Sequence, residues 1–289
     1  MSAPFHDGEL EVQARLGLDD IAQRAGRLVR DHLIDQHRDF YAALPFIVAA
    51  ARDDAGRPWA TLLVGPPGFL QSPDPQTLRI AATPRPGDAL AGALSRADPQ
   101  GRELGLLGID FATRRRNRVN GRLVAGHDGV LTLAVSQSFG NCPRYIHQHR
   151  LPWLEQGQRA EAPRRSEGLT SAQQTWIAEA DTFFIASGYS ASGMDVSHRG
   201  GSPGFVVVES PTRLCFPDFA GNNYFNTIGN LAVDPRAGLL FVDFDRGSLL
   251  QISGRASIDW DSPAVARVPG AQRLITVDID AVVELPQPL

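Results

Sequence analysis

The chain contains one series of motifs twice, in the same order. The matching segments are LPFIVAAARDDAGRPWATLLVGPPGF (44–69) with DTFFIASGYSASGMDVSHRGGSPGF (181–205), GLLGIDF (105–111) with GLLFVDF (238–244), and NGRLV (120–124) with SGRAS (253–257). Gly121 follows Gly105 by sixteen positions, and Gly254 follows Gly238 by the same number. Motifs repeated in a fixed order indicate a duplicated structural unit. With two copies, each long enough for its own core, the sequence predicts a tandem of two domains with a candidate site between them.

Both repeats are dominated by strand patterns. FIVAAAR and PWATLLVG flank the turn sequence DDAG, which predicts a hairpin, and TLRIAA, GLLGIDF, RRNRVNGRLV and GVLTLAVSQSF continue the sheet. This number of strands lets a sheet curl into a barrel. We therefore expect a mainly β fold with short helices, organised as residues 1–154, a polar linker at 155–169, and residues 170–289.

Four helical segments are expected besides the strands. The spacing of apolar residues predicts an amphipathic helix of about four turns from Leu18 to Leu33. A capping-box pattern at Thr170 and Gln173 opens a short helix through Ala180. CPRYIHQH (142–149) predicts a short helix, and GNNYFNTIGNLAVDPRA (221–237) predicts a helix or turn–helix that ends at Asp234.

The composition excludes several classes of function. Hydrophobic residues make up 43% and charged residues 21%, as in soluble globular proteins, and no apolar run approaches the ~18 residues of a membrane span. Without a signal-peptide pattern, we expect a cytoplasmic protein. The net charge of −4 argues against nucleic-acid binding, and the two cysteines form no metal-ligand pair. All 28 basic residues are arginine, so a lysine Schiff base is excluded.

Three polar clusters are candidates for a site. In TRRRNRVNGR (113–122) a strand would place Arg116, Arg118 and Asn120 on one face and Asn117 on the other. Arginines that share a face repel each other unless an anion lies among them, which favours a phosphate or cofactor contact. The alternative is a solvated edge strand whose charges prevent aggregation.

The second cluster surrounds a predicted helix start in FPDFAGNNYFNTIGN (216–230). It comprises Asp218, Asn222, Asn223, Asn226 and Thr227. Free backbone amides at a helix start bind anions, and the neighbouring aromatic residues suit a flat heteroaromatic ligand with a phosphate tail. Alternatively, the asparagines only cap and turn the chain.

The third cluster is GMDVSHRGG (193–201). As a strand it alternates Asp195, Ser197 and Arg199 on one face with His198 on the other, whereas the matching segment RPWATLLVG of the first repeat is apolar. Where duplicated halves diverge from apolar to polar, the polar copy is the better candidate for a site. An ordinary surface strand is the alternative.

Long motifs in order resemble the pyridoxamine 5′-phosphate oxidase-like, FMN-binding split-barrel family, in particular its two-barrel bacterial members. They are FHDGE, GRPWATLLVG, TRRRNRVNGR, SFGNCPRYI, GMDVSHRGG and FPDFAGNNYFNTIGNLAVDPRAGLLF. The resemblance implies tandem six-stranded split barrels related by a pseudo-twofold axis, with FMN in the groove between them. It assigns cofactor contacts to two groups of positions in the second barrel: the second strand (Asp195, Ser197, His198, Arg199) and the helix start (Asn222, Asn223, Asn226, Thr227). From the first barrel it assigns the arginine strand from Arg116 to Asn120.

The sequence departs from this family at the helix start. Asn223 and Tyr224 stand where a basic residue is usual, so the arginines are expected to neutralise the phosphate. The expected function is that of an FMN-dependent flavoprotein oxidoreductase acting on a small molecule of unknown identity. NAD(P)H or a separate reductase would supply electrons, no side chain stands out as an acid or base, and a homodimer is compatible with this function. The alternative is a non-catalytic flavin or haem carrier or sensor, with His198 a candidate haem contact. In either case we expect one of two unequal grooves to hold the ligand.

Overall fold

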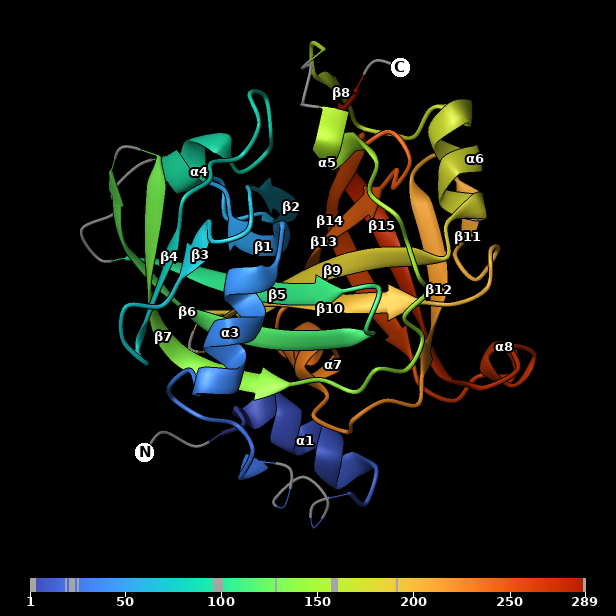
Figure 1. Cartoon of the computed structure of the whole chain (residues 1–289). Coiled ribbons are helices and arrows are strands. Elements are labelled where there is room, and N and C mark those ends of the chain that lie inside the picture. Colours follow the sequence, from blue (N-terminus) through green and yellow to red (C-terminus); the bar gives the residue numbers. More distant parts are fainter. Residues whose placement is uncertain are drawn as a thin grey trace.

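The computed structural model describes residues 4–18, 20, 24, 26–95, 101–127, 129–156, 161–190 and 192–287. Two antiparallel sheets dominate it (Figure 1). The strands of the first sheet are β1 (Phe46–Arg52), β2 (Pro58–Val64), β3 (Leu70–Gln71), β4 (Thr77–Ile80), β5 (Arg102–Asp110), β6 (Arg115–His127) and β7 (Val130–Gly140). Those of the second are β8 (Arg164–Ser166), β9 (Thr182–Tyr189), β10 (Gly193–Gly200), β11 (Val207–Ser210), β12 (Arg213–Phe219), β13 (Arg236–Val242), β14 (Leu249–Asp259) and β15 (Ala271–Leu285).

The two sheets have the same topology. Their strand orders are β2-β1-β5-β6-β7-β4-β3 and β10-β9-β13-β14-β15-β12-β11, so that β1–β7 correspond one by one to β9–β15. The expected mainly β fold of tandem split barrels with pseudo-twofold symmetry is confirmed. Along each order there are seven strands and not six, because the short β3 and β11 add an edge.

Short helices lie around the two sheets (Figure 1). They are α1 (Asp7–Arg15), α3 (Asp35–Ala43), α4 (Ala91–Ser95), α5 (Trp153–Gln156), α6 (Ser171–Glu179), α7 (Asn226–Val233) and α8 (Pro263–Ala266). The capping box of Thr170 and Gln173 opens α6, and α7 ends at Asp234; both were predicted. Within the segment expected to link the halves, β8 pairs with β15. No helix in the described ranges is long and apolar enough to cross a membrane.

One helix prediction holds only in part and another is wrong. Within the helix expected from Leu18 to Leu33, residues 20, 24 and 26 are helical, but it does not reach Leu33, since Arg30 forms a bridge with Ser138 of β7; residues 19, 21–23 and 25 lie outside the described ones. CPRYIHQH contains a turn and no helix, and Tyr145 has a left-handed backbone with φ 63°. The sequence also did not predict α1, α3, α4, α5 and α8, nor the short strands β3, β8 and β11.

The barrels meet where a strand of each crosses a strand of the other. In the first sheet, Ala50 of β1 pairs with Ala60 of β2 on one side and with Gly105 of β5 on the other. In the second sheet, Ala186 of β9 pairs in the same way with Val196 of β10 and with Gly238 of β13. A Cβ on Gly105 would lie 2.7 Å from the Cα of Asp195, and one on Gly238 would lie 2.8 Å from the Cα of Trp59. The repeated glycines therefore allow β10 to lie against β5 and β2 against β13, and they make Asp195 the counterpart of Trp59.

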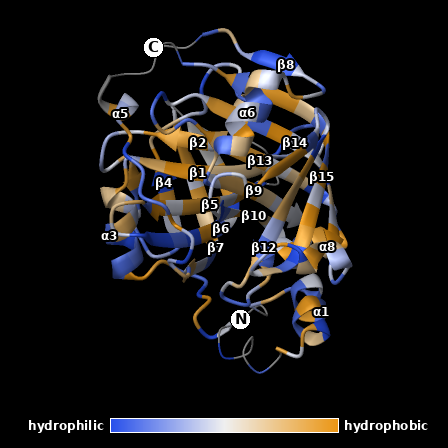
Figure 2. Cartoon of the chain, turned by 90° about the vertical axis from the view of Figure 1, so that its right-hand side faces the viewer, coloured by the Kyte–Doolittle hydropathy of each residue, from blue (hydrophilic) through white to orange (hydrophobic). Residues whose placement is uncertain are grey.

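The apolar side chains gather on the inside of both sheets. One cluster fills the first barrel and extends across the interface to Phe184, Val196 and Leu240. A second surrounds Phe183 and Ile252 in the other barrel. Figure 2 shows hydrophobic residues concentrated along the strands. The apolar contacts therefore continue across the interface beneath the polar groove residues.

Candidate functional site

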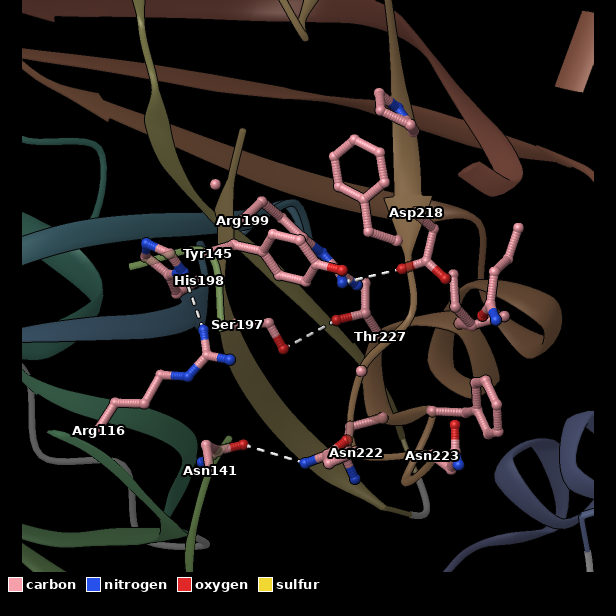
Figure 3. A pocket seen from close by; sticks show the side chains of 18 of the residues that line it. Arg116, Asn141, Tyr145, Ser197, His198, Arg199, Asp218, Asn222, Asn223 and Thr227 are labelled. Carbon is pink, nitrogen blue, oxygen red and sulfur yellow. Dashed lines mark hydrogen bonds and ion pairs between the residues drawn. The ribbon is translucent and has the colours of Figure 1, made fainter. Parts of the chain in front are cut away.

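A pocket lies between the barrels, where β6, β10, β12 and the start of α7 meet (Figure 3). The pocket is open to solvent, and the cavity including its mouth measures about 850 Å³. Tyr145 and Phe219 line it and stack with ring centroids 5.3 Å apart. The predicted residues that line this pocket are Arg116, Arg118, Ser197, His198, Arg199, Asp218, Asn222, Asn223, Asn226 and Thr227.

The remaining three predicted residues lie elsewhere. Asp195 and Asn120 line a neighbouring polar pocket, although Asp195 forms an ion pair with Arg118 of the first pocket. Asn117 is buried and lines neither pocket, because it is on the opposite face of β6. The three clusters that are separate in sequence thus converge on one region, with Asn117 outside it.

The arginines of the pocket differ in how their charges are balanced. Arg118 pairs with Asp195 at 2.9 Å and donates to Ser197 Oγ and Asn226 Oδ1, each at 2.6 Å. Arg199 pairs with Asp218 at 2.9 Å, and the buried Arg273 lies 3.3 Å from the other oxygen of the same carboxylate. Asp218 is therefore a counter-ion of two arginines.

Arg116 has no such partner. Its guanidinium donates to His198 Nδ1 at 2.8 Å, and no carboxylate contacts it in the part of the chain that the structure describes. Burial, together with the charges of Arg118 and Arg199, lowers the pKa of Arg116 to about 10. Figure 3 shows its side chain pointing from β6 into the cluster. Arg116 is half-buried, and a cation withdrawn from water without a counter-ion is costly, so this region favours an anion.

The hydrogen bond from Arg116 determines the state of His198. A guanidinium can only donate, so Nδ1 accepts and the ring proton of the neutral imidazole is on Nε2. Burial and the charge of Arg116 hold the pKa of His198 well below its usual value. In this tautomer Nε2 has no free lone pair, so His198 is not arranged to ligate a haem iron. Among the described residues, no group of three or more His, Cys, Asp or Glu could hold a metal ion.

The start of α7 is open to the same pocket. Phe225 precedes the helix with a left-handed backbone of φ 59°, and no side chain caps the first turn. Asn222 Oδ1 accepts from the amide of Tyr224 at 3.2 Å, and its Nδ2 donates to Asn141 at 3.4 Å. Free amides at a helix start carry partial positive charge, which adds to the attraction for an anion.

The corresponding groove on the other side of the pseudo-twofold axis is filled. Strand registers and the bulge glycines Gly121 and Gly254 define the matching residues. The matches are Leu249 with Arg116, Gln251 with Arg118, Thr61 with Ser197, Leu62 with His198 and Leu63 with Arg199. All of the counterparts in this second groove are buried. The grooves are therefore unequal, and apolar side chains occupy one of them.

The filled groove contains a carboxylate of its own. Asp88, just before α4, accepts from Thr61 Oγ1, from Gln251 Nε2 at 3.2 Å and from the amide of Leu90 at 2.8 Å. Helix α4 occupies the same place in the topology as α7. In the filled groove the Asp88 carboxylate thus accepts hydrogen bonds from the backbone before α4 and from polar side chains of β2 and β14. Among the described residues, no carboxylate accepts from a backbone amide at the start of α7; Glu9 contacts only the side chain of Asn226 there.

Sequence reasoning missed Glu9 and the mouth residues Asn141 and Tyr145. Glu9 is 4% exposed, and Asn226 Nδ2 donates to its carboxylate. The signal that could have found its helix is the FHDGE motif, where His6 and Glu9 form a capping box for α1. Nothing local indicates that this helix docks on α7.

No family model matches the chain, and no curated protein matches its sequence. Solved structures align with about two fifths of it. A candidate pyridoxamine 5′-phosphate oxidase of Lactobacillus delbrueckii is 14% identical over 40% of this chain and 94% of its own, with a TM-score of 0.34. An FAD-binding protein of Mesorhizobium loti is 13% identical over 44% of this chain and 99% of its own, with a TM-score of 0.29. The haem storage protein HutZ of Vibrio cholerae is 13% identical over 40% of this chain and 95% of its own, with a TM-score of 0.28.

Proposed function

We propose that the open groove binds a flavin mononucleotide and that the protein is a flavin-dependent oxidoreductase acting on a small molecule. The observation that carries the proposal is the uncompensated charge of Arg116 beside the uncapped start of α7. The filled groove provides a carboxylate at the corresponding helix, and a phosphate monoester has the charge and acceptor oxygens to take that role in the open groove.

The residues of the pocket fit the two parts of such a ligand. Arg116, Ser197 and Thr227 offer a guanidinium and two hydroxyls to the phosphate. Tyr145 and Phe219 offer an aromatic surface at the mouth to the ring system. A bound flavin would supply the hydride and electron chemistry, while these side chains bind and orient it. We expect NAD(P)H or a separate reductase to supply the electrons.

Titration of the purified protein with FMN and with riboflavin, followed by flavin fluorescence, tests the binding. Arg116→Gln should weaken FMN by roughly tenfold or more, because a charge-assisted hydrogen bond to the phosphate is lost. Riboflavin lacks the phosphate, so its affinity should not change. Arg115→Gln is the matched control, since this neighbouring arginine is exposed and lies over the Phe40 ring outside the pocket.

The redox step has a separate measurement. Anaerobic bleaching of the bound flavin by NAD(P)H or an added reductase supports an oxidoreductase. A flavin that stays bound and is never reduced indicates a carrier or sensor. Protein that ignores FMN, or that shows a Soret band with haem, contradicts the flavin proposal.

A further inference from the structure

The N-terminal helix α1 is fixed against α7 by close backbone packing. A Cβ on Gly8 would lie 2.5 Å from the carbonyl oxygen of Gly229, and Gln13 donates to the carbonyl of Tyr224 at 3.3 Å. The two helices can approach so closely because Gly8 and Gly229 have no side chain. Because the two helices are in contact, Glu9 is buried next to Asn226, the first residue of α7.

A short chain of contacts joins Glu9 to the pocket. The amide of His6 donates to Glu9 Oε2 at 2.9 Å, and Asn226 Nδ2 donates to Glu9 Oε1. The other end of the same amide, Asn226 Oδ1, accepts from Arg118 Nη1 at 2.6 Å. Asn226 therefore links a buried carboxylate to a guanidinium that lines the anion site.

Among the described residues, Glu9 has no permanently charged cation beside it: His6 Nε2 lies 3.7 Å from Glu9 Oε2, but burial lowers the pKa of that imidazole. His6 and Asp7 are its neighbours on its own segment, Asp195 faces it from β10, and Arg118 lies beyond Asn226 on β6. Glu103 of β5 and Arg122 of β6 line the same polar pocket and pair with each other. Burial, with a smaller contribution from Asp195, raises the pKa of Glu9 to about 7.

We propose that Glu9 is a positioning residue for the anion site, and that its carboxylate weakens anion binding by partly compensating Arg118 through Asn226. When Glu9 is neutral, the region around the pocket gains one unit of net positive charge. An anion should then bind more tightly. The inference rests on the anion site of the proposed function, but it does not require the anion to be a flavin.

The binding of inorganic sulfate and of FMN to the full-length protein tests this inference between about pH 5.5 and pH 8.5, the range over which Glu9 titrates. Sulfate does not titrate in this range, so its affinity follows the protein alone. In the wild type, sulfate affinity should fall as the pH rises through the pKa of Glu9. Glu9→Gln should equal the wild type at the acidic end and bind roughly fivefold more tightly at the basic end.

Glu11→Gln is the control, because Glu11 is exposed on the same helix and should follow the wild type throughout. A ratio between Glu9→Gln and wild type that does not change with pH, or weaker binding by Glu9→Gln at the basic end, overturns the role of Glu9. If sulfate shows the expected pattern while FMN does not bind, the flavin proposal fails and the Glu9 inference stands. If FMN binds but its affinity shows no pH-dependent difference between Glu9→Gln and the wild type, the flavin proposal stands and the Glu9 inference fails. Protein that binds neither anion contradicts both.

Discussion

Arg116 and Arg118 lie two residues apart on β6, yet their surroundings are opposite. Arg118 has a carboxylate, a hydroxyl and an amide as partners, whereas Arg116 has a neutral imidazole. The sequence shows both arginines on one face of a strand. It does not show which of them is already neutralised, because every partner comes from the other barrel. This difference makes Arg116 the residue whose loss should matter most to an anionic ligand.

Glu9 should also affect stability. Its pKa is raised from 4.5 to about 7, so the folded state binds its proton more tightly than the unfolded state does. This contribution is complete below pH 4.5 and is lost as the pH rises through about 7. Relative to Glu9→Gln, the unfolding free energy of the wild type should fall by about 3 kcal/mol over this interval. Urea unfolding at several pH values measures it, and parallel pH profiles for the two proteins would contradict it.

The repeated glycines have structural explanations at the level of the strands. Gly105 and Gly238 lie where strands of the two barrels cross, and Gly121 and Gly254 lie at bulges in β6 and β14. Strand patterns were predictable because the inward faces alternate or run apolar. The helix prediction for residues 142–149 is wrong because this segment packs against β10. A Cβ on Gly200 of β10 would lie 2.0 Å from the carbonyl oxygen of Tyr145. No local pattern records that contact.

The crossing glycines provide a test at this scale. Gly105→Ala should destabilise the protein by about 2 kcal/mol or more, since the new methyl group meets the backbone of Asp195 and neither strand can retreat. Gly92→Ala in α4 is the control, because nothing lies within 4 Å of its added Cβ. It should be neutral or slightly stabilising. Denaturant midpoints compare the two, and equal effects would refute the crossing argument.

At the scale of the molecule, duplication produced two related grooves of which one is closed. Leucines and Gln251 occupy the places of Arg116, His198, Arg199 and Arg118, and Asp88 satisfies the polar groups that remain. The divergence of GMDVSHRGG from RPWATLLVG already pointed to unequal grooves. The sequence did not indicate that the second groove supplies its own carboxylate, since Asp88 lies in an unremarkable loop.

The proposed ligand should bind once per chain, because the matching positions of the second groove are buried. Equilibrium titration with FMN should saturate at one equivalent per chain. Asp88→Asn should lower the denaturation midpoint, because a buried carboxylate that accepts three hydrogen bonds is replaced, but it should leave the stoichiometry unchanged. Two equivalents bound by the wild type would show that the filled groove opens.

Local pattern alone determined the duplication, the longer strands and the three polar clusters of the candidate site. Alternation, turn residues and repeated glycines express constraints that act between neighbours in the chain. The tertiary structure decided which charges are balanced. The partners of Arg116, Arg118 and Glu9 lie 82, 108 and 217 residues away, on elements that meet only when the barrels and α1 pack together. Whether a charged side chain has a counter-ion depends on distances in space, and these distances cannot be read from spacing along the sequence.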